Sequence, residues 1–75
     1  MLIETYFLPC TENRPSRIKA RKGTQSVVLA WDHALEPFGN HRRAFEAMKE
    51  SGQFAFTWGK DGVGLWVSTD RIYEV

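Results

Sequence analysis

The run Ser-Arg-Ile-Lys-Ala-Arg-Lys-Gly-Thr-Gln-Ser-Val-Val-Leu-Ala-Trp, residues 16–31, determines the fold that we expect. Over residues 16–22, charged and apolar side chains alternate with the period of two of a β-strand that is covered on one face. Gly23 and Thr24 then supply a tight turn, and residues 25–31 are the most apolar segment of the chain. We therefore expect a β-hairpin whose second strand has a central, well-covered position in a sheet.

The first strand of this hairpin has one basic face. Its alternation turns Ile18 and Ala20 toward a core and places three basic residues on the other side: Arg17, Lys19 and Arg21. From Asn13 to Trp31 the chain has five basic residues and no acidic one, out of ten Lys and Arg and a net charge of +1 for the whole protein. Because the protein is nearly neutral, any binding of nucleic acid has to rest on this local patch.

Three further strands are expected outside the hairpin, over residues 2–8, 53–58 and 63–68. Pro9 ends the first of them, and residues 10–15 have the composition of a loop. The tripeptide Lys60-Asp61-Gly62 is typical of a turn between the last two strands. Beyond a turn at residues 69–71, residues 72–75 form either a short final strand or a tail.

One helix is expected over residues 41–51, with Asn40 as its N-cap and Gly52 just after its C-terminus. Its apolar stripe consists of Ala44, Phe45 and Met48 with Ala47 beside them. We expect this stripe to cover one face of the sheet, with three contacts there: Trp31, Phe56 and Leu65.

The order of these elements predicts an α+β fold. Three strands, one helix and two strands (β-β-β-α-β-β) form an antiparallel sheet of about five strands with one helix packed on one face. The 75 residues make one small domain, spanning residues 1–75.

Composition narrows the class of protein further. Cys10 is the only cysteine, which excludes an intrachain disulfide and a zinc site built on paired cysteines, and favours a reducing, cytoplasmic setting. We expect neither a signal peptide nor a membrane span, because no apolar run has the required length. No nucleophile, base and orienting partner can be assembled from the sequence, so we expect no enzyme, no cofactor and no metal.

The run Leu-Pro-Cys-Thr-Glu-Asn-Arg-Pro-Ser-Arg-Ile-Lys-Ala, residues 8–20, resembles a family of small proteins from phages, plasmids and bacterial mobile elements. Those proteins read roughly Leu-Pro-Ala-Thr-Asn-Thr-Arg-Gly-Ser-Arg-Ile-Lys-Ala near their start. Trp-Asp-His-Ala-Leu, residues 31–35, and Asn40-His41 are also similar to that family, whereas Cys10 and Pro15 depart from it. The resemblance covers most of the first fifty residues. It implies a mobile-DNA context and supplies no catalytic residues.

The basic strand is the first candidate site. Its charges recur about 7 Å apart, which suits contacts to phosphates or to an acidic partner. The candidate interface has seven residues: Arg14, Arg17, Lys19, Arg21, Lys22, Arg42 and Arg43. The alternative is a solvated outer face that keeps the sheet soluble and protects an edge.

The predicted first turn of the helix, with His41, Arg42 and Arg43, is a second candidate. Cations there oppose the helix dipole, and together with free N–H groups they would hold a phosphate or a carboxylate. The alternative is that both arginines reach Glu46, Glu36 or Asp32 and stay in solvent.

His33 and His41 are a third candidate, since a meeting across the loop, with Asp32 as the orienting carboxylate, would suit acid–base or metal chemistry. No third ligand has a recognisable spacing, so a structural role in the loop is favoured. Cys10 has basic neighbours but no paired histidine, which argues against a catalytic thiol.

Trp58 and Trp66 are candidate platforms for stacking on bases, with Trp66 the one retained as a site residue. The alternative is that a chain this short needs its aromatic side chains for the core.

Two functions from different classes remain open. The first is a small nucleic-acid-binding protein of a phage or mobile element that uses the basic strand. The second is a protein-interaction module, such as a phage-encoded inhibitor of a host defence complex. It would use the same strand or an exposed aromatic patch against an acidic or nucleic-acid-binding host protein. The apolar strand also suits a homodimer.

Overall fold

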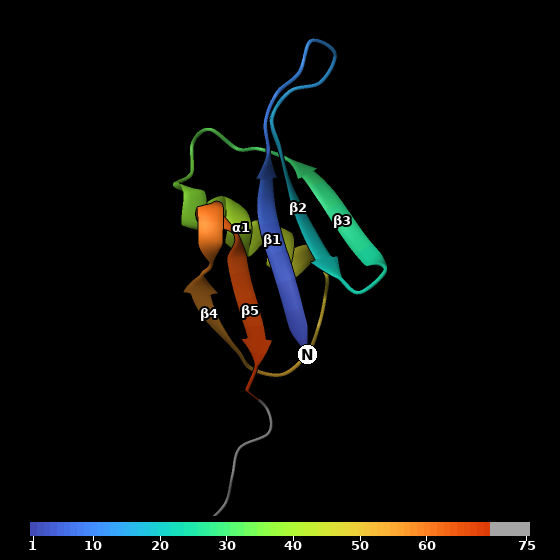
Figure 1. The fold of residues 1–75 in the computed structure, drawn as a ribbon, viewed down its shortest axis with the longest axis vertical. Coiled ribbons are helices and arrows are strands. Elements are labelled where there is room, and N and C mark those ends of the chain that lie inside the picture. Colours follow the sequence, from blue (N-terminus) through green and yellow to red (C-terminus); the bar gives the residue numbers. More distant parts are fainter. Residues whose placement is uncertain (70–75) are drawn as a thin grey trace, which may run out of the picture.

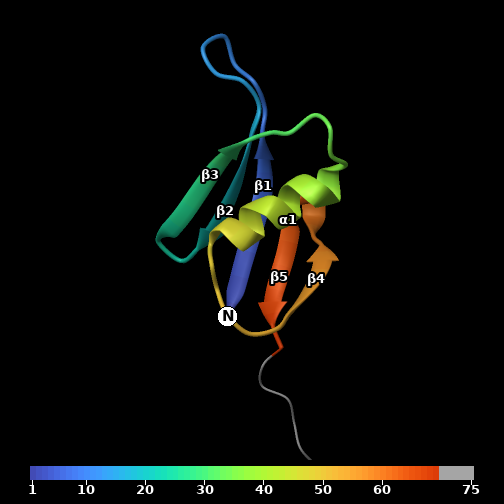
Figure 2. The ribbon, with the colours of Figure 1, turned by 180° about the vertical axis from the view of Figure 1, so that it is seen from behind.

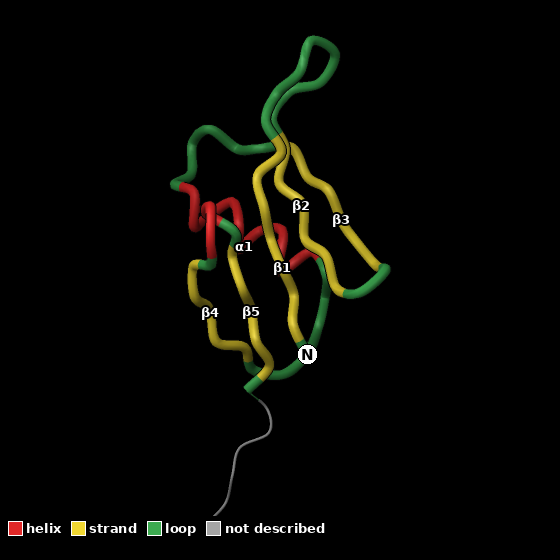
Figure 3. The backbone as a smooth tube through the Cα atoms, viewed as in Figure 1, coloured by secondary structure: helices red, strands yellow, loops and turns green. Residues whose placement is uncertain are grey.

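The computed structural model describes residues 1–69, which form one antiparallel sheet with one helix against it (Figure 1 and Figure 3). In chain order the elements are β1 (Leu2–Leu8), β2 (Arg17–Lys22), β3 (Gln25–Ala30), α1 (Pro37–Ala47), β4 (Phe54–Trp58), the short 3-10 turn η1 (Lys60–Gly62) and β5 (Gly64–Ser68). The predicted α+β class and the β-β-β-α-β-β order are confirmed. Residues 70–75, and with them the predicted final strand or tail, lie outside the described residues.

The strand order in the sheet is β3-β2-β1-β5-β4, so β1 is central and β3 and β4 are the edges. The prediction of a central position for the apolar strand, now β3, is wrong. After β3 the chain passes through α1 to the other side of the sheet, and β5 pairs with β1 instead. The apolarity of β3 has another origin, because Leu29 packs against the core beneath the helix.

Helix α1 crosses one face of the sheet (Figure 2). The buried apolar side chains come from β1, β2, β5 and the helix: Ile3, Ile18, Ala20, Ala44 and Trp66. Phe45 stacks on the Trp66 indole with ring centroids 4.2 Å apart and planes 8° apart. The predicted apolar stripe therefore faces the sheet.

The predicted contacts of this stripe hold in part. Trp31 and Phe56 do pack against the core. Leu65 does not, because β5 pairs with β1 in a register that aligns Trp66 with the buried Ile3 and turns Leu65 to the other face. The indole of Trp66 takes the place predicted for Leu65.

The helix begins about one turn earlier than predicted. It spans Pro37–Ala47 with Glu36 as its N-cap, and Lys49, rather than Gly52, is the first residue after it with positive φ, at 58°. Proline suits the first helical turn because its missing N–H would have no partner there. Asn40, the predicted N-cap, lies inside the helix, and its side chain bonds to the loop before the helix instead.

Asn40 connects the helix to the end of β3. Its Oδ1 accepts the Asp32 N–H at 2.8 Å, and its Nδ2 donates to the Asp32 carbonyl at 3.0 Å. Asp32 in turn accepts the N–H of Ala34 with its own side chain at 2.9 Å. Since Asn40 is fully buried, these bonds hold the loop from β3 to α1 in one conformation.

A second buried polar group joins three elements. The Thr5 hydroxyl on β1 accepts the Trp66 Nε1–H of β5 at 3.0 Å and forms a 2.8 Å hydrogen bond with Nδ1 of His41 on α1. Gly64 makes this approach possible, because a Cβ there would lie 2.5 Å from the Thr5 hydroxyl oxygen. The cluster fixes the height of the helix above the sheet.

We predict that Thr5→Val lowers the free energy of unfolding by about 1–3 kcal/mol, because two buried partners lose their hydrogen bond. The matched control is Thr57→Val on exposed β4 surface, which should change stability by less than about 0.5 kcal/mol. Urea denaturation followed by tryptophan fluorescence measures both. Equal stability of the two variants would show that the cluster contributes nothing.

Candidate nucleic-acid interface

The sheet face opposite α1 is covered by no other part of residues 1–69, and it faces the viewer in Figure 1. Ile18 and Ala20 are fully buried on the helix side, as predicted. The side chains that alternate with these two along β2 point to the uncovered face, and we call them the basic column: Arg17, Lys19 and Arg21.

The pairing of strands fixes the neighbours of the basic column. Across β1, β2 and β3 the aligned residues on this face form three rows: Leu8–Arg17–Ala30, Tyr6–Lys19–Val28 and Glu4–Arg21–Ser26. Two of the three rows contain no acidic residue. The column therefore runs along an interior strand between mostly apolar and small neighbours.

Arg21 is the member of the column with a charged partner. Its guanidinium lies 2.7 Å from the Glu4 carboxylate, and this hydrogen bond raises the pKa of Arg21. Both side chains are solvated, so the pair adds little to stability. Glu4 neutralises one end of the column.

Arg17 and Lys19 have no carboxylate partner within residues 1–69. The Nζ of Lys19 lies 6.0 Å from the centre of the Tyr6 ring, at the outer limit of a cation–π contact. The Arg17 Nε is buried and has no acceptor among the described residues. The positive charge of this face is thus concentrated at the Arg17 end of β2.

Arg14 lies in the hairpin loop that connects β1 to β2. Figure 1 shows this loop extending past the Arg17 end of the sheet. A bond from the Thr11 N–H to the Arg14 carbonyl, 2.8 Å long, closes the tip. Arg14 and Cys10 are both exposed there. The position of Arg14 extends the positive surface beyond the end of the column.

The other three candidates do not join this face. Lys22 follows the alternation to the helix side, where its Nζ donates to Glu50. Arg42 pairs with Glu46 one turn along α1 at 3.1 Å, so the alternative of a solvated ion pair is confirmed for Arg42 and not for Arg43. Arg43 donates to the Ala30 carbonyl and to Asn40 Oδ1, each at 3.2 Å. The seven predicted residues therefore do not form one surface.

The prediction of an anion site at the helix N-terminus is wrong. Because the helix begins at Pro37, Arg42 and Arg43 lie in its second turn, and their side chains are already used as described. The free N–H groups and the two arginines are not together.

The two histidines are separated. His41 is buried and bonds to Thr5, whereas His33 is exposed in the loop after β3, which Asp32 and Asn40 hold in its place. The predicted meeting of the two rings with Asp32 is wrong. Within residues 1–69 no three His, Cys, Asp or Glu side chains are grouped so as to hold a metal ion.

Trp66 is 6% exposed and lies under Phe45, so its indole cannot stack on a base and the prediction for this residue is wrong. Trp58 is 48% exposed, edge-on to His41. Phe38 and Trp58 both contact the Phe56 ring, with centroids 5.0 Å and 4.9 Å from it, and Leu35 lies beside Gly39 at the start of α1. We call the three exposed side chains Trp58, Phe38 and Leu35 the aromatic patch. Of its members sequence reasoning singled out only Trp58, because the patch depends on where the helix begins.

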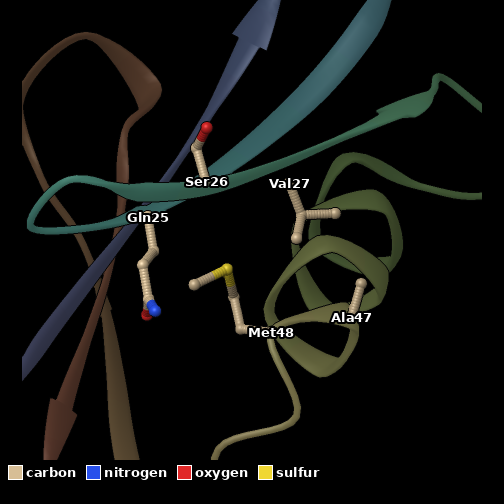
Figure 4. A pocket seen from close by; sticks show the side chains of 5 residues that line it. All are labelled: Gln25, Ser26, Val27, Ala47 and Met48. Atoms are coloured by element: carbon tan, nitrogen blue, oxygen red, sulfur yellow. The ribbon is translucent and has the colours of Figure 1, made fainter.

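An open hollow of about 380 Å³ lies between the start of β3 and the end of α1 (Figure 4). Five residues line it: Gln25, Ser26, Val27, Ala47 and Met48. None of these side chains is acidic, basic or nucleophilic enough for acid–base or covalent chemistry. The lining of the hollow suits contact with another side chain rather than catalysis.

Residues 1–69 contain no helix with the length and apolar character that crossing a bilayer requires. Comparison of the chain with protein family models, with curated proteins and with solved structures finds no match in any of the three. The similarity to mobile-element proteins therefore stays a prediction.

Stability should depend on pH through His41. Burial lowers the pKa of His41, so the folded protein binds this proton more weakly than the unfolded chain does. Stability is then fully present above the unfolded pKa of about 6.5 and is lost as the pH falls toward the folded value. We predict that the free energy of unfolding falls measurably between pH 7.5 and pH 5 in urea titrations.

Two variants test whether His41 causes this pH dependence of stability. His41→Gln removes the titrating group and should flatten the pH dependence over that range, whereas His33→Gln changes an exposed ring and should preserve it. A wild-type stability that is constant from pH 7.5 to pH 5 would contradict the role of His41. So would a slope that survives in His41→Gln.

Proposed function

We propose that this protein is a non-enzymatic binding protein that contacts nucleic acid through the basic column, with Arg14 extending the surface. The observation that carries the proposal is that the sheet face opposite the helix is uncovered and positively charged. On this face the basic column and its neighbours on β1 and β3 include a single acidic residue, Glu4. The resemblance to mobile-element proteins adds a context in which DNA or RNA is at hand.

The geometry suits contacts to a phosphate backbone. Alternate residues on a strand are about 7 Å apart, close to the spacing of successive phosphates. Because β2 is paired on both sides, by β1 and by β3, the Cα positions of the column are fixed before any ligand arrives. Little backbone order then has to be gained on binding.

The charge count sets the strength of such binding. Among the described residues 1–69, Arg14, Arg17 and Lys19 have no carboxylate partner, and Arg21 shares its charge with Glu4. About three phosphates are then neutralised, which predicts a slope of log K against log salt near −2 to −3. This is modest, so binding should be weak and sequence-independent at physiological salt.

We predict that the triple variant Arg17→Gln, Lys19→Gln, Arg21→Gln loses at least about tenfold in affinity for a short DNA or RNA. Each lost phosphate contact lowers the number of counterions that are released when the protein binds. Fluorescence anisotropy at low salt measures the affinity. Nuclease-resistant analogues are not needed, since no catalysis is expected.

The matched control for this test removes three positive charges elsewhere. The control variant replaces three exposed residues outside the basic column and lowers the net charge by three, as the column variant does: Arg42→Gln, Lys49→Gln and Lys60→Gln. This control should retain most of the affinity. Equal losses in the two triple variants would show that only bulk charge matters, and unchanged binding in the column variant would refute the proposal.

The aromatic patch favours a second candidate, a protein-interaction module such as an inhibitor of a host defence complex. Trp is among the residue types that contribute most to binding energy at protein interfaces, and Phe is enriched in them. The three side chains of the patch are each 39% exposed or more, although large apolar side chains are usually buried: Trp58, Phe38 and Leu35. The patch lies on the helix side, away from the basic column.

For this candidate we predict a partner from a host lysate that stays bound after nuclease treatment and at high salt, and that Trp58→Ala releases. Affinity capture with quantitative mass spectrometry measures the retention. The basic-column triple variant is the control, because it should keep such a partner. Capture that depends on intact nucleic acid would instead support the first candidate.

A further inference from the structure

We propose that the free edge of β3 pairs with β3 of a second copy of this chain, antiparallel and about a two-fold axis, so that two sheets join into one. Main-chain geometry and packing at this edge both favour such pairing. Pairing of β3 would occur whether or not the basic column binds nucleic acid.

The hydrogen-bond pattern shows which groups of β3 are free. The Trp31 N–H donates to the Ser16 carbonyl at 3.1 Å, one step beyond the aligned pair Arg17 and Ala30. Bonded pairs recur every second residue in an antiparallel ladder, so β3 bonds to β2 through residues 25, 27 and 29. The N–H and C=O groups of Ser26 and Val28 therefore point away from β2.

No described element satisfies those groups. The strand order ends at β3, which Figure 1 shows at the outside of the sheet. The Ala30 carbonyl is the exception, because Arg43 donates to it. Ser26 and Val28 are exposed, and Val28 is 44% exposed although it is apolar.

The edge also lacks the features by which proteins prevent edge pairing. Such features are prolines, charged side chains, bulges and very short strands. Residues 25–30 contain no proline and no charged residue, and their pairing with β2 is continuous over six residues. Apart from its contact with Arg43, the strand is open to another strand.

The hollow of Figure 4 supplies a second observation. It lies on the helix side of this same edge, where Val27 faces Met48 and Ala47. A strand added to β3 would place its inward side chains over this hollow. Apolar side chains there would gain contacts that the isolated chain leaves unfilled.

The sequence of β3 suits a second copy as the occupant. A two-fold axis through Val27 would align Ser26 of each chain with Val28 of the other and set the two Val27 side chains together over the hollows. Since β3 is uncharged, no like charges would face each other across the new pair. Equally, it offers no charge to select an acidic or a basic strand from a different protein.

The basic columns do not oppose this pairing. In the joined sheet the two β2 strands are separated by three strand spacings, about 14 Å. That distance exceeds the screening length of about 8–10 Å at physiological salt. The pairing would place both columns on one continuous face.

The contact is small, so the dimer should be weak. A single six-residue strand pair with one hollow on each side belongs to the low end of interface sizes. We expect a dissociation constant on the order of micromolar to hundreds of micromolar. Concentration is therefore the variable to scan.

Sedimentation equilibrium from about 5 µM to about 1 mM tests the inference on the full chain. We expect the wild-type mass to rise from monomer toward dimer. Val28→Lys, which places a charge on the open edge, should stay monomeric across the range. Thr57→Lys makes the same change on the outer face of the other edge strand, β4, and should dimerise as the wild type does.

Ser26→Pro is a second test of the same edge. It removes an N–H that the ladder with β2 does not use, so the monomer should fold while the dimer is lost. Circular dichroism confirms the fold of each variant. Amide exchange adds a direct reading, because the Val28 N–H should become more protected as concentration rises while Leu29 stays protected throughout.

Four results would overturn the inference. They are a wild type that is monomeric up to about 1 mM, a Val28→Lys variant that dimerises like the wild type, a Thr57→Lys variant that is monomeric, and assemblies larger than a dimer. The last two would place β4 in the interface. Open-ended growth in particular would indicate pairing of β3 with β4 of the next chain.

Discussion

The arrangement of helix and sheet depends on one buried hydroxyl. Thr5 lies at the centre of the sheet and bonds to the indole of Trp66 and to the ring of His41. Through it the central strand, its neighbour β5 and the helix are held at one separation. The stacking of Phe45 on Trp66 and the bare backbone of Gly64 belong to the same arrangement. A small core gains specificity from such a group, because few alternative packings would satisfy all of its partners.

Because the described part of the chain, residues 1–69, contains one α-helix, that helix covers only one face of the sheet. The helix side receives the aromatic side chains, and the other side is left with the basic column, Glu4, Tyr6 and several partly exposed apolar residues. This division explains why a nearly neutral protein has a locally positive surface. It also leaves β3 and β4 as open edges, since no further element is present in residues 1–69 to cap them.

A feature could be predicted from the sequence when it depends on residues that are close together in the chain. The alternation in β2 depends on neighbours two residues apart, so the basic column and its buried counterparts Ile18 and Ala20 could be predicted. The sequence places the helix start one turn too late, because Asn40 and Gly52 both have the properties of capping residues. Nothing local shows that the Asn40 side chain is committed to Asp32.

The candidate site shows the same limit. Arg42 and Arg43 move from a helix start to its second turn once the helix begins at Pro37, and Lys22 is turned to the helix side. Trp66 and Leu65 exchange roles because the pairing of β5 with β1, distant in sequence, decides which of two adjacent residues faces the core.

By itself, then, the sequence determined the kinds of element, their order, the turn at Gly23 and Thr24, and the basic face of β2. These depend on side-chain periodicity and backbone preference within a few residues. Only the tertiary structure decided that β3 is an edge, that His41 is buried against Thr5, and that the aromatic patch and the hollow exist. Each of these depends on which distant segments meet, and a periodic pattern carries no information about its partner.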